Sequence, residues 1–316
     1  MLERVQIENF RCLRKVDVPL RPLTVLIGPN DSGKSVFLLA LKQLVEYERF
    51  IALDAWRAEE RNVIRISGNL GDCGRIEVGR APGLQLFTVD GQNPLCPLGF
   101  YHLPSSGASM QCSEHFDVHG PPEMGLSGQF APALLDFLLR RDRKRFDALV
   151  DAMRSLVPGL EEINIATPDP GMVRIDLVIE DGLRLPADRA SAGLRLLIFF
   201  VALAYHPSPR RFILIEEPEN GVHPKRLEDV MRLLREITEG RHGDHAAQIV
   251  LSTHSPHLLD YVDIEKDQVL VFRRNDDGSR TAEPADAERL KTFLDEFMLG
   301  EVWYNEGEAG LVGPAK

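Results

Sequence analysis

The chain has 316 residues, of which 44% are hydrophobic and 27% are charged, as is ordinary for a soluble globular protein. The net charge of −11 and the pI of about 5.4 exclude a global electrostatic attraction to nucleic acid, although a local basic groove is compatible with them. The strongest candidate for a membrane span, Leu194 to Ala204, is interrupted by Arg195 and is shorter than the ~18–20 residues required. Because Met1 to Arg4 also lacks a secretory apolar region, we expect a cytoplasmic protein without membrane association, and four cysteines without a C-x-x-C pair fit a reducing compartment.

The first half of the chain alternates apolar strands with a helix and then becomes irregular. Strands are predicted over 5–10 and 23–27, and a helix from 36 to about 47 could extend toward residue 57. Short β-like runs broken by glycines over 63–89 predict an antiparallel lobe. The Pro, Gly and Ser residues of 91–128 predict a long irregular connection.

The second half alternates in α/β fashion. A helical region over 131–156 is followed by a strand over 172–179, which ends at the tight turn Asp181-Gly182. We expect a single α/β domain over 1–316, with residues 58–188 inserted as a β and helical lobe. The remaining predicted elements are helix 191–205, strand 212–216, helix 224–239, strand 248–252, a short helix at 256–260, strand 268–273 and helix 285–297.

A phosphate-binding loop is the clearest motif of the chain. Residues Gly28 to Ser35 read G-x-x-x-x-G-K-S and stand between an apolar strand and a helix. A glycine-rich turn at a helix N-terminus directs backbone N–H groups at one anion. Lys34 can reach the β- and γ-phosphates of a nucleotide, and the Ser35 hydroxyl can ligate Mg²⁺. The motif predicts that the chain binds a nucleoside triphosphate.

Acidic and imidazole side chains follow two later apolar strands. Residues 212–215 form an apolar run that ends in Glu216-Glu217-Pro218, at the strand end where α/β sheets bind ligands. The first acid can hold Mg²⁺, and the second can orient or deprotonate the water that attacks the γ-phosphate. The next strand ends in Ser252-Thr253-His254, which would place His254 at the same sheet edge.

A third candidate phosphate contact opens the helix predicted at 191–205. Ser191 and Gly193 at this helix start offer an N-cap hydroxyl and exposed N–H groups, which suit a phosphate. The same residues are equally explained as a plain helix cap without any ligand.

Taken in their order, these motifs resemble those of ABC-type ATPase heads. The phosphate loop, the Ser-x-Gly helix start, Ile-Glu-Glu-Pro-Glu-Asn-Gly-Val-His-Pro from 215 and Ser-Thr-His-Ser-Pro from 252 are similar to the SMC/RecF-like branch. In particular, they resemble the ATPase part of overcoming-lysogenization-defect (OLD) proteins. The opening Ile-Glu-Asn-Phe-Arg at 7–11 also resembles that branch, whose first strands approach the adenine. The expected fold is therefore a P-loop NTPase, an ABC-ATPase-like head.

The resemblance implies a role for each matching residue. Gly28 to Ser35 is the Walker A loop, Glu216 the Walker B acid on the Mg²⁺ side, Glu217 the catalytic base and His254 the switch histidine. Ser191 to Gly193 is the signature that completes the site of a second subunit, so the resemblance implies an ATP-sandwiched homodimer. The residues expected at ATP and Mg²⁺ are Phe10, Arg11, Asn30, Asp31, Ser32, Gly33, Lys34, Ser35, Ser191, Gly193, Glu216, Glu217, Asn220 and His254.

The sequence departs from the ABC pattern at three points. Glu216 stands where many ABC ATPases have Asp, although this form is familiar in OLD-like proteins. The signature lacks the following Gly-Gln of transporter subunits. No glutamine is assigned to the Q-loop, for which the candidates are Gln85, Gln111 and Gln129.

Two further clusters admit a simpler interpretation. Cys112, His115 and His119, with Cys96 and His102 upstream, superficially resemble a zinc site, but their spacing fits no standard pattern, and we expect surface histidines and unpaired thiols. The run 140–145 contains five basic residues in six. Such runs usually form a solvated helix face, and contact with DNA phosphates is the alternative.

The leading hypothesis is an ATPase that dimerises with ATP and acts as a nucleotide-gated switch on DNA, on an effector protein or on both. The resemblance to the family suggests a role in genome maintenance or anti-phage defence. Only residues 255–316 follow His254, too few for the Toprim nuclease domain of full-length OLD proteins, so we expect no nuclease in this chain. A transporter nucleotide-binding subunit is the alternative, and the incomplete signature weighs against it. A module that binds ATP with little hydrolysis is the third hypothesis.

Overall fold

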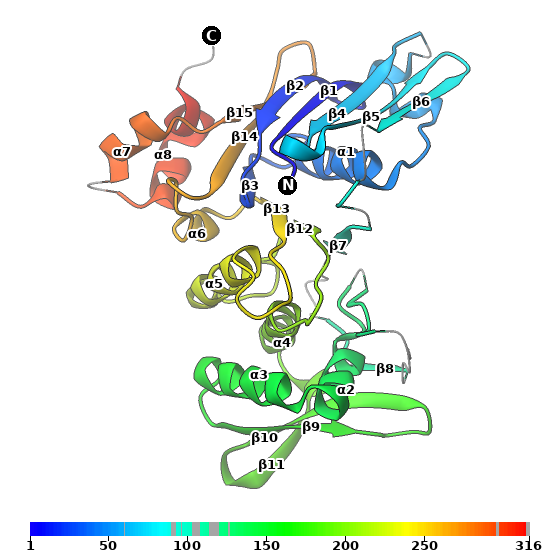
Figure 1. Cartoon of the computed structure of the whole chain (residues 1–316). Helices are drawn as coiled ribbons and strands as arrows, with labels where there is room; N and C mark the ends of the chain where they lie inside the picture. Colours follow the sequence, from blue (N-terminus) through cyan, green and yellow to red (C-terminus); the bar gives the residue numbers. More distant parts are fainter. Residues whose placement is uncertain are drawn as a thin grey trace. The chain divides into compact units, whose positions relative to one another are not determined.

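The chain divides into two compact units, which are described separately (Figure 1). Unit 1 comprises Met1–Phe100, Arg210–Glu217 and Gln248–Lys316, and unit 2 comprises Tyr101–Pro209 and Pro218–Ala247. The computed structural model describes residues 1–59, 61–89, 93–95, 97–102, 108–113, 120–125, 127–294 and 297–313.

Unit 1 is built on one large mixed sheet. The sheet has the strand order β6-β5-β4-β1-β2-β15-β14-β3-β13-β12-β7, and its last strand, β7 (Gly99–His102), runs across the boundary of the units. The other strands are β1 (Arg4–Phe10), β2 (Leu13–Pro19), β3 (Leu23–Ile27), β4 (Ile64–Asn69), β5 (Arg75–Ala81), β6 (Leu84–Val89), β12 (Phe212–Glu216), β13 (Gln248–Thr253), β14 (Gln268–Arg274) and β15 (Arg280–Pro284).

The two halves of this sheet differ in strand direction and in burial. β12, β13, β3 and β14 are parallel neighbours, and every residue of β3 and β13 is buried. Continuous apolar runs are the sequence form of parallel strands that are covered on both faces. From β2 to β6 all pairings are antiparallel, and in β1 buried and exposed residues largely alternate. The strands predicted within the inserted lobe at 63–89 are thus part of the main sheet of unit 1.

Helix α1 (Lys34–Glu46) packs on this sheet through its apolar face, and its Phe37 ring meets Phe272 of β14 edge to face at a centroid distance of 5.4 Å. The helix ends at Glu46, because Tyr47 adopts a left-handed backbone with φ 55°. The expected extension toward residue 57 is therefore wrong, and 3₁₀ turns occupy 52–54 and 56–58. The remaining helices of unit 1 are α6 (Pro256–Leu259), α7 (Ala287–Leu294) and α8 (Leu299–Val312), the last of which was not predicted.

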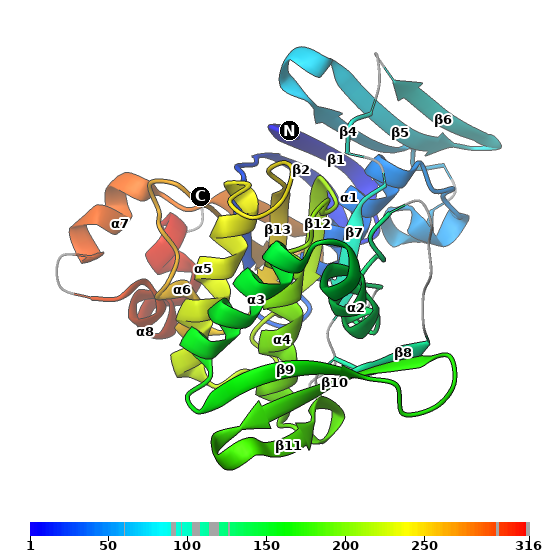
Figure 2. The same ribbon diagram turned by 60° about the horizontal axis from the view of Figure 1, so that its bottom comes forward.

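Unit 2 places helices against a smaller antiparallel sheet (Figure 2). In this sheet β10 pairs with β8, β9 and β11, and the predicted strand 172–179 coincides with β10. Helix α4 is buried along most of its length, from Leu196 to Ala204, as its nearly uniform apolar sequence requires. The elements of unit 2 are β8 (Gln111–Ser113), α2 (Ala131–Arg141), α3 (Arg143–Leu156), β9 (Leu160–Ala166), β10 (Met172–Ile179), β11 (Leu183–Pro186), α4 (Ala192–Ala204) and α5 (Leu227–Thr238).

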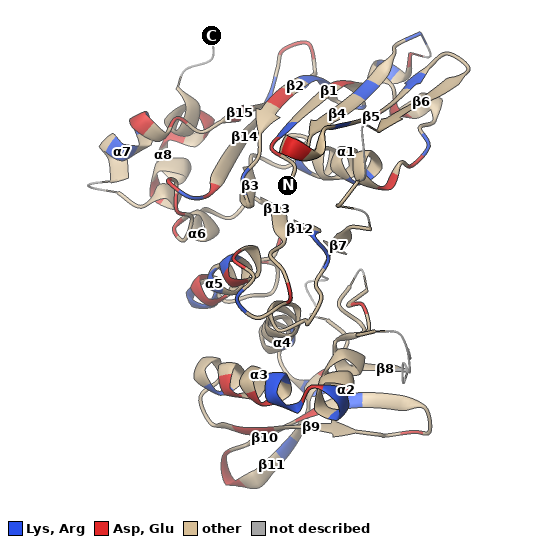
Figure 3. Cartoon of the chain, in the orientation of Figure 1, with Lys and Arg blue, Asp and Glu red and all other residues tan. Residues whose placement is uncertain are grey.

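The helical region predicted at 131–156 is broken at Asp142, in the middle of the basic run (Figure 3). Asp142 caps α3 by accepting a hydrogen bond from the Arg145 backbone N–H at 3.1 Å, and its carboxylate also pairs with the Arg145 side chain at 3.0 Å. Arg140 pairs with Asp136 at 2.7 Å, and Arg143 pairs with Asp147 at 2.8 Å. Three of the five basic residues therefore have acidic partners within unit 2, as expected for a solvated helix face.

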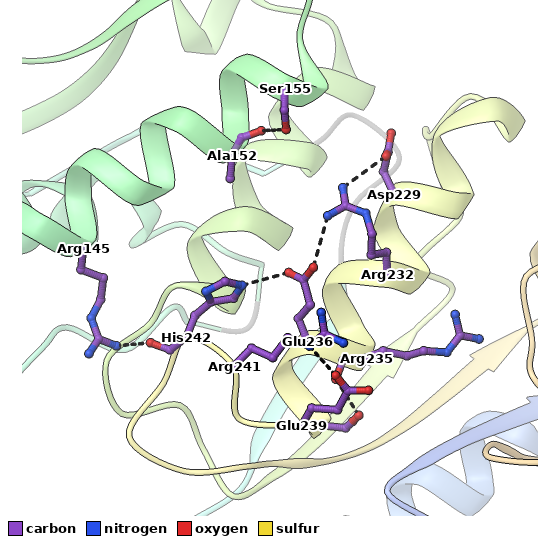
Figure 4. A network of polar contacts seen from close by, with 11 residues as sticks. Arg145, Ala152, Ser155, Asp229, Arg232, Arg235, Glu236, Glu239, Arg241 and His242 are labelled. Atoms are coloured by element: carbon purple, nitrogen blue, oxygen red, sulfur yellow. Dashed lines mark hydrogen bonds and ion pairs between the residues drawn. The ribbon is translucent and has the colours of Figure 1, made fainter.

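Arg145 also ties α3 to the segment that follows α5. Its guanidinium donates to the His242 carbonyl, and the His242 ring contacts Glu236 at 3.1 Å (Figure 4). The same ring stacks on Tyr205 at a centroid distance of 4.2 Å. These contacts give Arg145 a structural role in unit 2.

Candidate active site

The phosphate-binding loop joins the end of β3 at Ile27 to the start of α1 at Lys34. Gly33 has φ 101°, a conformation that favours glycine. A Cβ atom at Gly28 would lie 2.6 Å from Ser32 Oγ and 2.9 Å from the Phe272 carbonyl oxygen. Both glycines of the motif are therefore required by the shape of the loop.

Lys34 lies along the inside of the loop. Its Nζ atom donates to the carbonyl oxygens of Gly28 at 2.7 Å and Pro29 at 2.9 Å, and the residue is only 7% exposed. The cation of the motif is thus fixed at the centre of the loop, where the resemblance places the β- and γ-phosphates.

A pocket of about 810 Å³ opens above this loop within unit 1. Seven predicted residues line it together, the run Asn30 to Ser35 and Glu217. Sequence reasoning missed four other lining residues, Cys12, Val36, Arg274 and Arg280. Of these, the two arginines flank the turn at Asp276-Asp277-Gly278 and are paired in register across the hairpin of β14 and β15. An Asp-Asp-Gly turn between two strand-like runs is the sequence signal that could have indicated this pairing.

The lining residues fit a nucleoside triphosphate with Mg²⁺. The glycine-rich loop precedes the N-terminus of α1, where backbone N–H groups favour an anion, and Lys34 supplies a cation. Ser35 is exposed at the pocket and lines it with Glu217, and hydroxyl and carboxylate oxygens are ligands of the kind that Mg²⁺ prefers. Such an ion would neutralise charge on the β- and γ-phosphates when bound.

The two predicted acids stand at the end of β12. Glu216 is its last residue and is paired in register with Ser252 of the neighbouring β13. Glu217 follows with φ 47°, and its backbone N–H donates to the Ser252 carbonyl at 2.9 Å. A left-handed backbone is unfavourable for a residue other than glycine, and such strain concentrates at functional sites. Glu217 lines the pocket, whereas Glu216 does not.

His254 follows β13 and lies beside Glu217. The distance from its Nδ1 atom to Glu217 Oε1 is 3.2 Å, and the His254 side chain is 45% exposed. The parallel pairing of β12 and β13 therefore brings the predicted base and the predicted switch histidine together at one sheet edge.

The residues expected near the adenine, Phe10 and Arg11, do not line this pocket. Phe10 is fully buried in the core of unit 1, where its ring meets Phe50 edge to face at 5.9 Å. Arg11 pairs with Asp54 at 2.9 Å and does not line the pocket. It is Cys12, the next residue of this loop, that reaches the pocket.

The remaining predicted site residues belong to unit 2. Ser191 caps α4 by accepting a hydrogen bond from the Leu194 backbone N–H at 3.3 Å, and it is exposed. A Cβ atom at Gly193 would lie 3.0 Å from the Gly221 carbonyl oxygen. The start of α4 therefore packs against the turn that contains Asn220 and Gly221, which joins the expected signature and D-loop within unit 2.

The glutamine candidates bind backbone groups or lie outside the pocket. Gln85 exchanges two hydrogen bonds with the Phe50 backbone, and Gln129 accepts one from Ser127. Gln111 belongs to β8. None of the three is among the pocket-lining residues.

Among the described residues no three His, Cys, Asp or Glu side chains are grouped closely enough to hold a metal ion by themselves. Cys96, His115 and His119 of the superficial zinc pattern lie outside the described residues. Cys112 is buried in unit 2, and burial raises the pKa of its thiol. A search of the described helices for one long and apolar enough to cross a membrane finds none.

Two family models match this chain, and each covers one part of the candidate site. Residues 1–72, with the phosphate loop, match the family described as "AAA ATPase domain". Residues 118–260, with both acids and His254, match the family described as "AAA domain, putative AbiEii toxin, Type IV TA system".

Solved structures share the fold. An SMC head bound to the C-winged helix domain of ScpA aligns with a TM-score of 0.62 at 14% identity, over 92% of this chain and 99% of that one. The SMC head domain from Thermotoga maritima aligns with a TM-score of 0.55 at 14% identity, over 90% of this chain and 99% of that one. The fold is therefore that of P-loop NTPases of the ABC-ATPase head type, and residues 28–35 carry the loop of this fold.

One relative indicates a more specific type of ATPase head. The OLD nuclease of Thermus scotoductus is 26% identical over 371 aligned residues, which cover 95% of this chain and 68% of that protein. With the SMC structures, this similarity supports an ATPase head of OLD- and SMC-like type, as the motifs predicted.

Proposed function

We propose that the protein hydrolyses ATP with Mg²⁺ and uses the bound nucleotide to control its own dimerisation. The observation that carries this proposal is the contact between Glu217 and His254 at the phosphate-loop pocket. A lysine-containing loop alone binds nucleotide, whereas a carboxylate held beside the pocket and an imidazole in contact with it are the parts that hydrolysis adds.

In this proposal each residue has one task. Lys34 and the backbone N–H groups of the loop bind the β- and γ-phosphates, and Ser35 with Glu216 would hold Mg²⁺. Glu217 accepts a proton from the attacking water, and His254 orients the Glu217 carboxylate. The strained backbone at Glu217 supports this assignment, because it turns the side chain of a residue directly after β12 toward the pocket.

The composite site is the second part of the proposal. Ser191 is exposed at the N-terminus of α4, and Gly193 beside it packs on the turn of Asn220. An exposed helix N-terminus favours a phosphate, so this surface of one subunit would meet the γ-phosphate bound by another. ATP would thereby hold two copies together, and hydrolysis would release them.

The output of this switch would go to DNA or to an effector protein, as the resemblance to SMC- and OLD-like proteins implies. Within the basic run at 140–145, only Arg141 and Lys144 form no ion pair with a carboxylate of the described residues, and both are exposed. Two cations are few for the phosphate contacts on which DNA binding depends. We therefore favour an effector protein over DNA bound through this run.

The test combines hydrolysis with measurement of mass. Single-turnover hydrolysis by the wild type should be measured across protein concentration, and light scattering should be applied to Glu217→Gln with ATP. ATP should convert this variant to a dimer, and the specific activity of the wild type should fall at concentrations where it is monomeric. If the wild type binds ATP without hydrolysing it, the protein is an ATP-binding module and not an ATPase. If the specific activity stays constant down to concentrations at which the protein is clearly monomeric, the composite site is wrong.

Two variants of Ser191 separate its two roles. Ser191→Ala removes the hydroxyl cap of α4, at about 0.5–2 kcal/mol of stability, and adds no bulk. Ser191→Arg adds a cation that opposes the helix dipole and obstructs the surface. Both variants should still bind ATP. If Ser191→Ala dimerises with ATP and Ser191→Arg does not, the proposed interface is supported. If the two variants dimerise to the same extent, Ser191 acts only as a helix cap.

A further inference from the structure

Two arginines face the nucleotide pocket from the hairpin of β14 and β15. Arg274 ends β14 and Arg280 begins β15, and the two are directly paired across the hairpin. Like charges in directly opposed cross-strand positions destabilise a sheet. Both residues line the pocket of the phosphate loop, so an anion bound there would offset their repulsion.

Arg280 is fixed to the phosphate loop. Its Nε atom donates to the Asp31 carbonyl at 2.7 Å, and its guanidinium also donates to the Gly278 carbonyl. Its Cβ and Cγ atoms lie 3.2 and 3.3 Å from the place where a Cβ atom at Gly33 would stand. Asp31 and Gly33 both have a positive φ, so Arg280 contacts the phosphate loop at the residues whose backbone conformation is energetically least favourable.

Arg274 differs from its neighbour in its surroundings. It is exposed, and within the described part of the chain no carboxylate forms an ion pair with it. The adjacent Arg273 donates instead to the carbonyl oxygens of Glu308 and Gly313, away from the lining of the pocket. Arg274 is therefore a cation at the pocket that no described side chain neutralises.

The charges of the lining support an anionic occupant. Three cationic side chains, Lys34, Arg274 and Arg280, line the pocket with two carboxylates, Asp31 and Glu217. This local excess of positive charge stands in a chain whose net charge is −11.

We propose that Arg274 binds phosphate oxygens of the nucleotide held at the phosphate loop, and that Arg280 is a positioning residue that fixes the loop at Asp31. This inference rests on the proposed ATP site and adds to it a pair of residues at the other end of the chain. A guanidinium is suited to this task, because it presents several N–H donors in a fixed plane to phosphate oxygens.

The test measures nucleotide affinity by calorimetry in the full chain. Arg274→Gln should raise the Kd for ATP about tenfold, as expected for the loss of a charge-assisted hydrogen bond at an exposed site. Arg274→Lys should recover part of this loss, and the difference from wild type should shrink at high salt, where exposed charges are screened. An unchanged Kd for Arg274→Gln would overturn the proposal.

A matched control uses Arg14. This exposed residue pairs with Asp277 on the same hairpin at 3.1 Å and does not line the pocket, so Arg14→Gln removes the same charge nearby and should leave the Kd unchanged. If Arg14→Gln and Arg274→Gln raise the Kd for ATP equally, the effect comes from the general loss of positive charge, and the proposed contact between Arg274 and the phosphates is wrong. Circular dichroism of both variants checks that they are folded.

Inorganic tripolyphosphate separates a phosphate contact from a nucleoside contact. Arg274→Gln should weaken tripolyphosphate and ATP by similar factors; weakening of ATP alone would overturn the phosphate assignment. A wild type that binds neither compound would instead refute the proposed nucleotide site itself.

Arg280 is tested through its conservative variant. Arg280→Lys keeps a donor for the Asp31 carbonyl and should retain most of the ATP affinity, whereas Arg280→Met should lose it. Equal ATP affinity in wild type and Arg280→Met would overturn the positioning role.

Discussion

His254 Nδ1 lies 3.2 Å from Glu217 Oε1, although 37 positions separate the two residues in the chain. They meet because each residue follows one of two adjacent parallel strands, β12 and β13, whose register pairs Glu216 with Ser252. The sheet therefore sets the position of both side chains, and it brings His254 into contact with the carboxylate that lines the pocket.

Glu217→Gln should keep ATP binding and lower single-turnover hydrolysis by roughly 10²–10⁴-fold, the effect of losing a general base. The amide keeps the size of the side chain and removes its basicity. Rapid-quench measurement of phosphate release checks this result.

Glu216→Gln serves as the comparison for Glu217→Gln. Its defect should be partly overcome by raising the Mg²⁺ concentration, because the proposed task of Glu216 is to hold the ion. Hydrolysis by Glu217→Gln at the wild-type rate would mean that the two acids have been assigned in the wrong order.

Lys34→Ala should weaken ATP binding sharply, because it removes the cation that the Gly28 and Pro29 carbonyls hold inside the loop. Calorimetry with ATP provides the measurement. Lys42→Ala is a suitable control, since Lys42 lies on the same helix, pairs with Glu46 and Glu48, and does not line the pocket. Unchanged affinity in Lys34→Ala would be incompatible with the phosphate-loop assignment.

Asp142→Ala should destabilise unit 2 by about 1 kcal/mol, the usual contribution of an N-cap. The substitution leaves the Arg145 backbone N–H without the side-chain acceptor that now caps α3. Urea unfolding followed by circular dichroism measures the change.

Asp151→Ala is the matched variant for the cap. Asp151 lies on the same helix, and its side chain is 70% exposed where it pairs with Arg154, so its loss should cost less than about 0.5 kcal/mol. If both variants lose the same stability, the cap at Asp142 has no special contribution.

Cys12 should report occupancy of the pocket. Burial raises the pKa of its thiol, against the opposing effect of Arg280, so less thiolate is present at a given pH and alkylation should be slow. ATP should slow it further, because Cys12 lines the pocket. Mass spectrometry after iodoacetamide treatment gives the rate, and exposed Cys73 is the internal reference, whose modification ATP should leave unchanged. Equal protection of both thiols would point to a global change in place of occupancy.

Asp277 makes the hairpin of Arg274 and Arg280 sensitive to acid. Hydrogen bonds from the Ser279 hydroxyl and backbone N–H, together with Arg14, lower the pKa of Asp277. A lowered pKa in the folded state stabilises the fold above the unfolded value of about 3.9, and this stabilisation is lost as the pH falls through the lower folded value.

Asp277→Asn should therefore lower the Tm near neutral pH, and the difference from wild type should vanish in strong acid. Thermal unfolding followed across pH provides the measurement. Asp276→Asn removes the same charge at the neighbouring position, whereas the hydrogen bonds from Ser279 and Arg14 go to Asp277. Identical profiles for the two variants would argue against a contribution of these contacts.

The buried parallel strands and the motifs at their ends could be predicted from sequence, because a continuous apolar run followed by polar residues is typical of a strand buried on both faces. β3 and β12 begin and end where they were expected. The same reasoning placed Glu217 and His254 at one sheet edge, since parallel strands present their carboxyl ends together.

Features set by pairing between distant segments could not be predicted in this way. Glycine-rich strands over 63–89 carry no signal of their partner, so their addition to β1 was missed. Phe10 reads equally as a ring beside the adenine or as a core residue, and only the packing against Phe50 decides. Arg280 reaches the pocket because β15 pairs with β2, a relation that the local sequence does not encode.

The left-handed backbone at position 217 favours glycine, whereas the proposed chemistry requires the carboxylate of Glu217. A glycine there would relieve about 1 kcal/mol of conformational strain, and β-branched residues would fit worst. Neither choice provides a carboxylate beside His254. Replacing Glu217 by glycine would thus raise the stability of the protein and lower its rate of ATP hydrolysis. Selection of variants for thermal stability alone would therefore favour loss of the proposed catalytic residue.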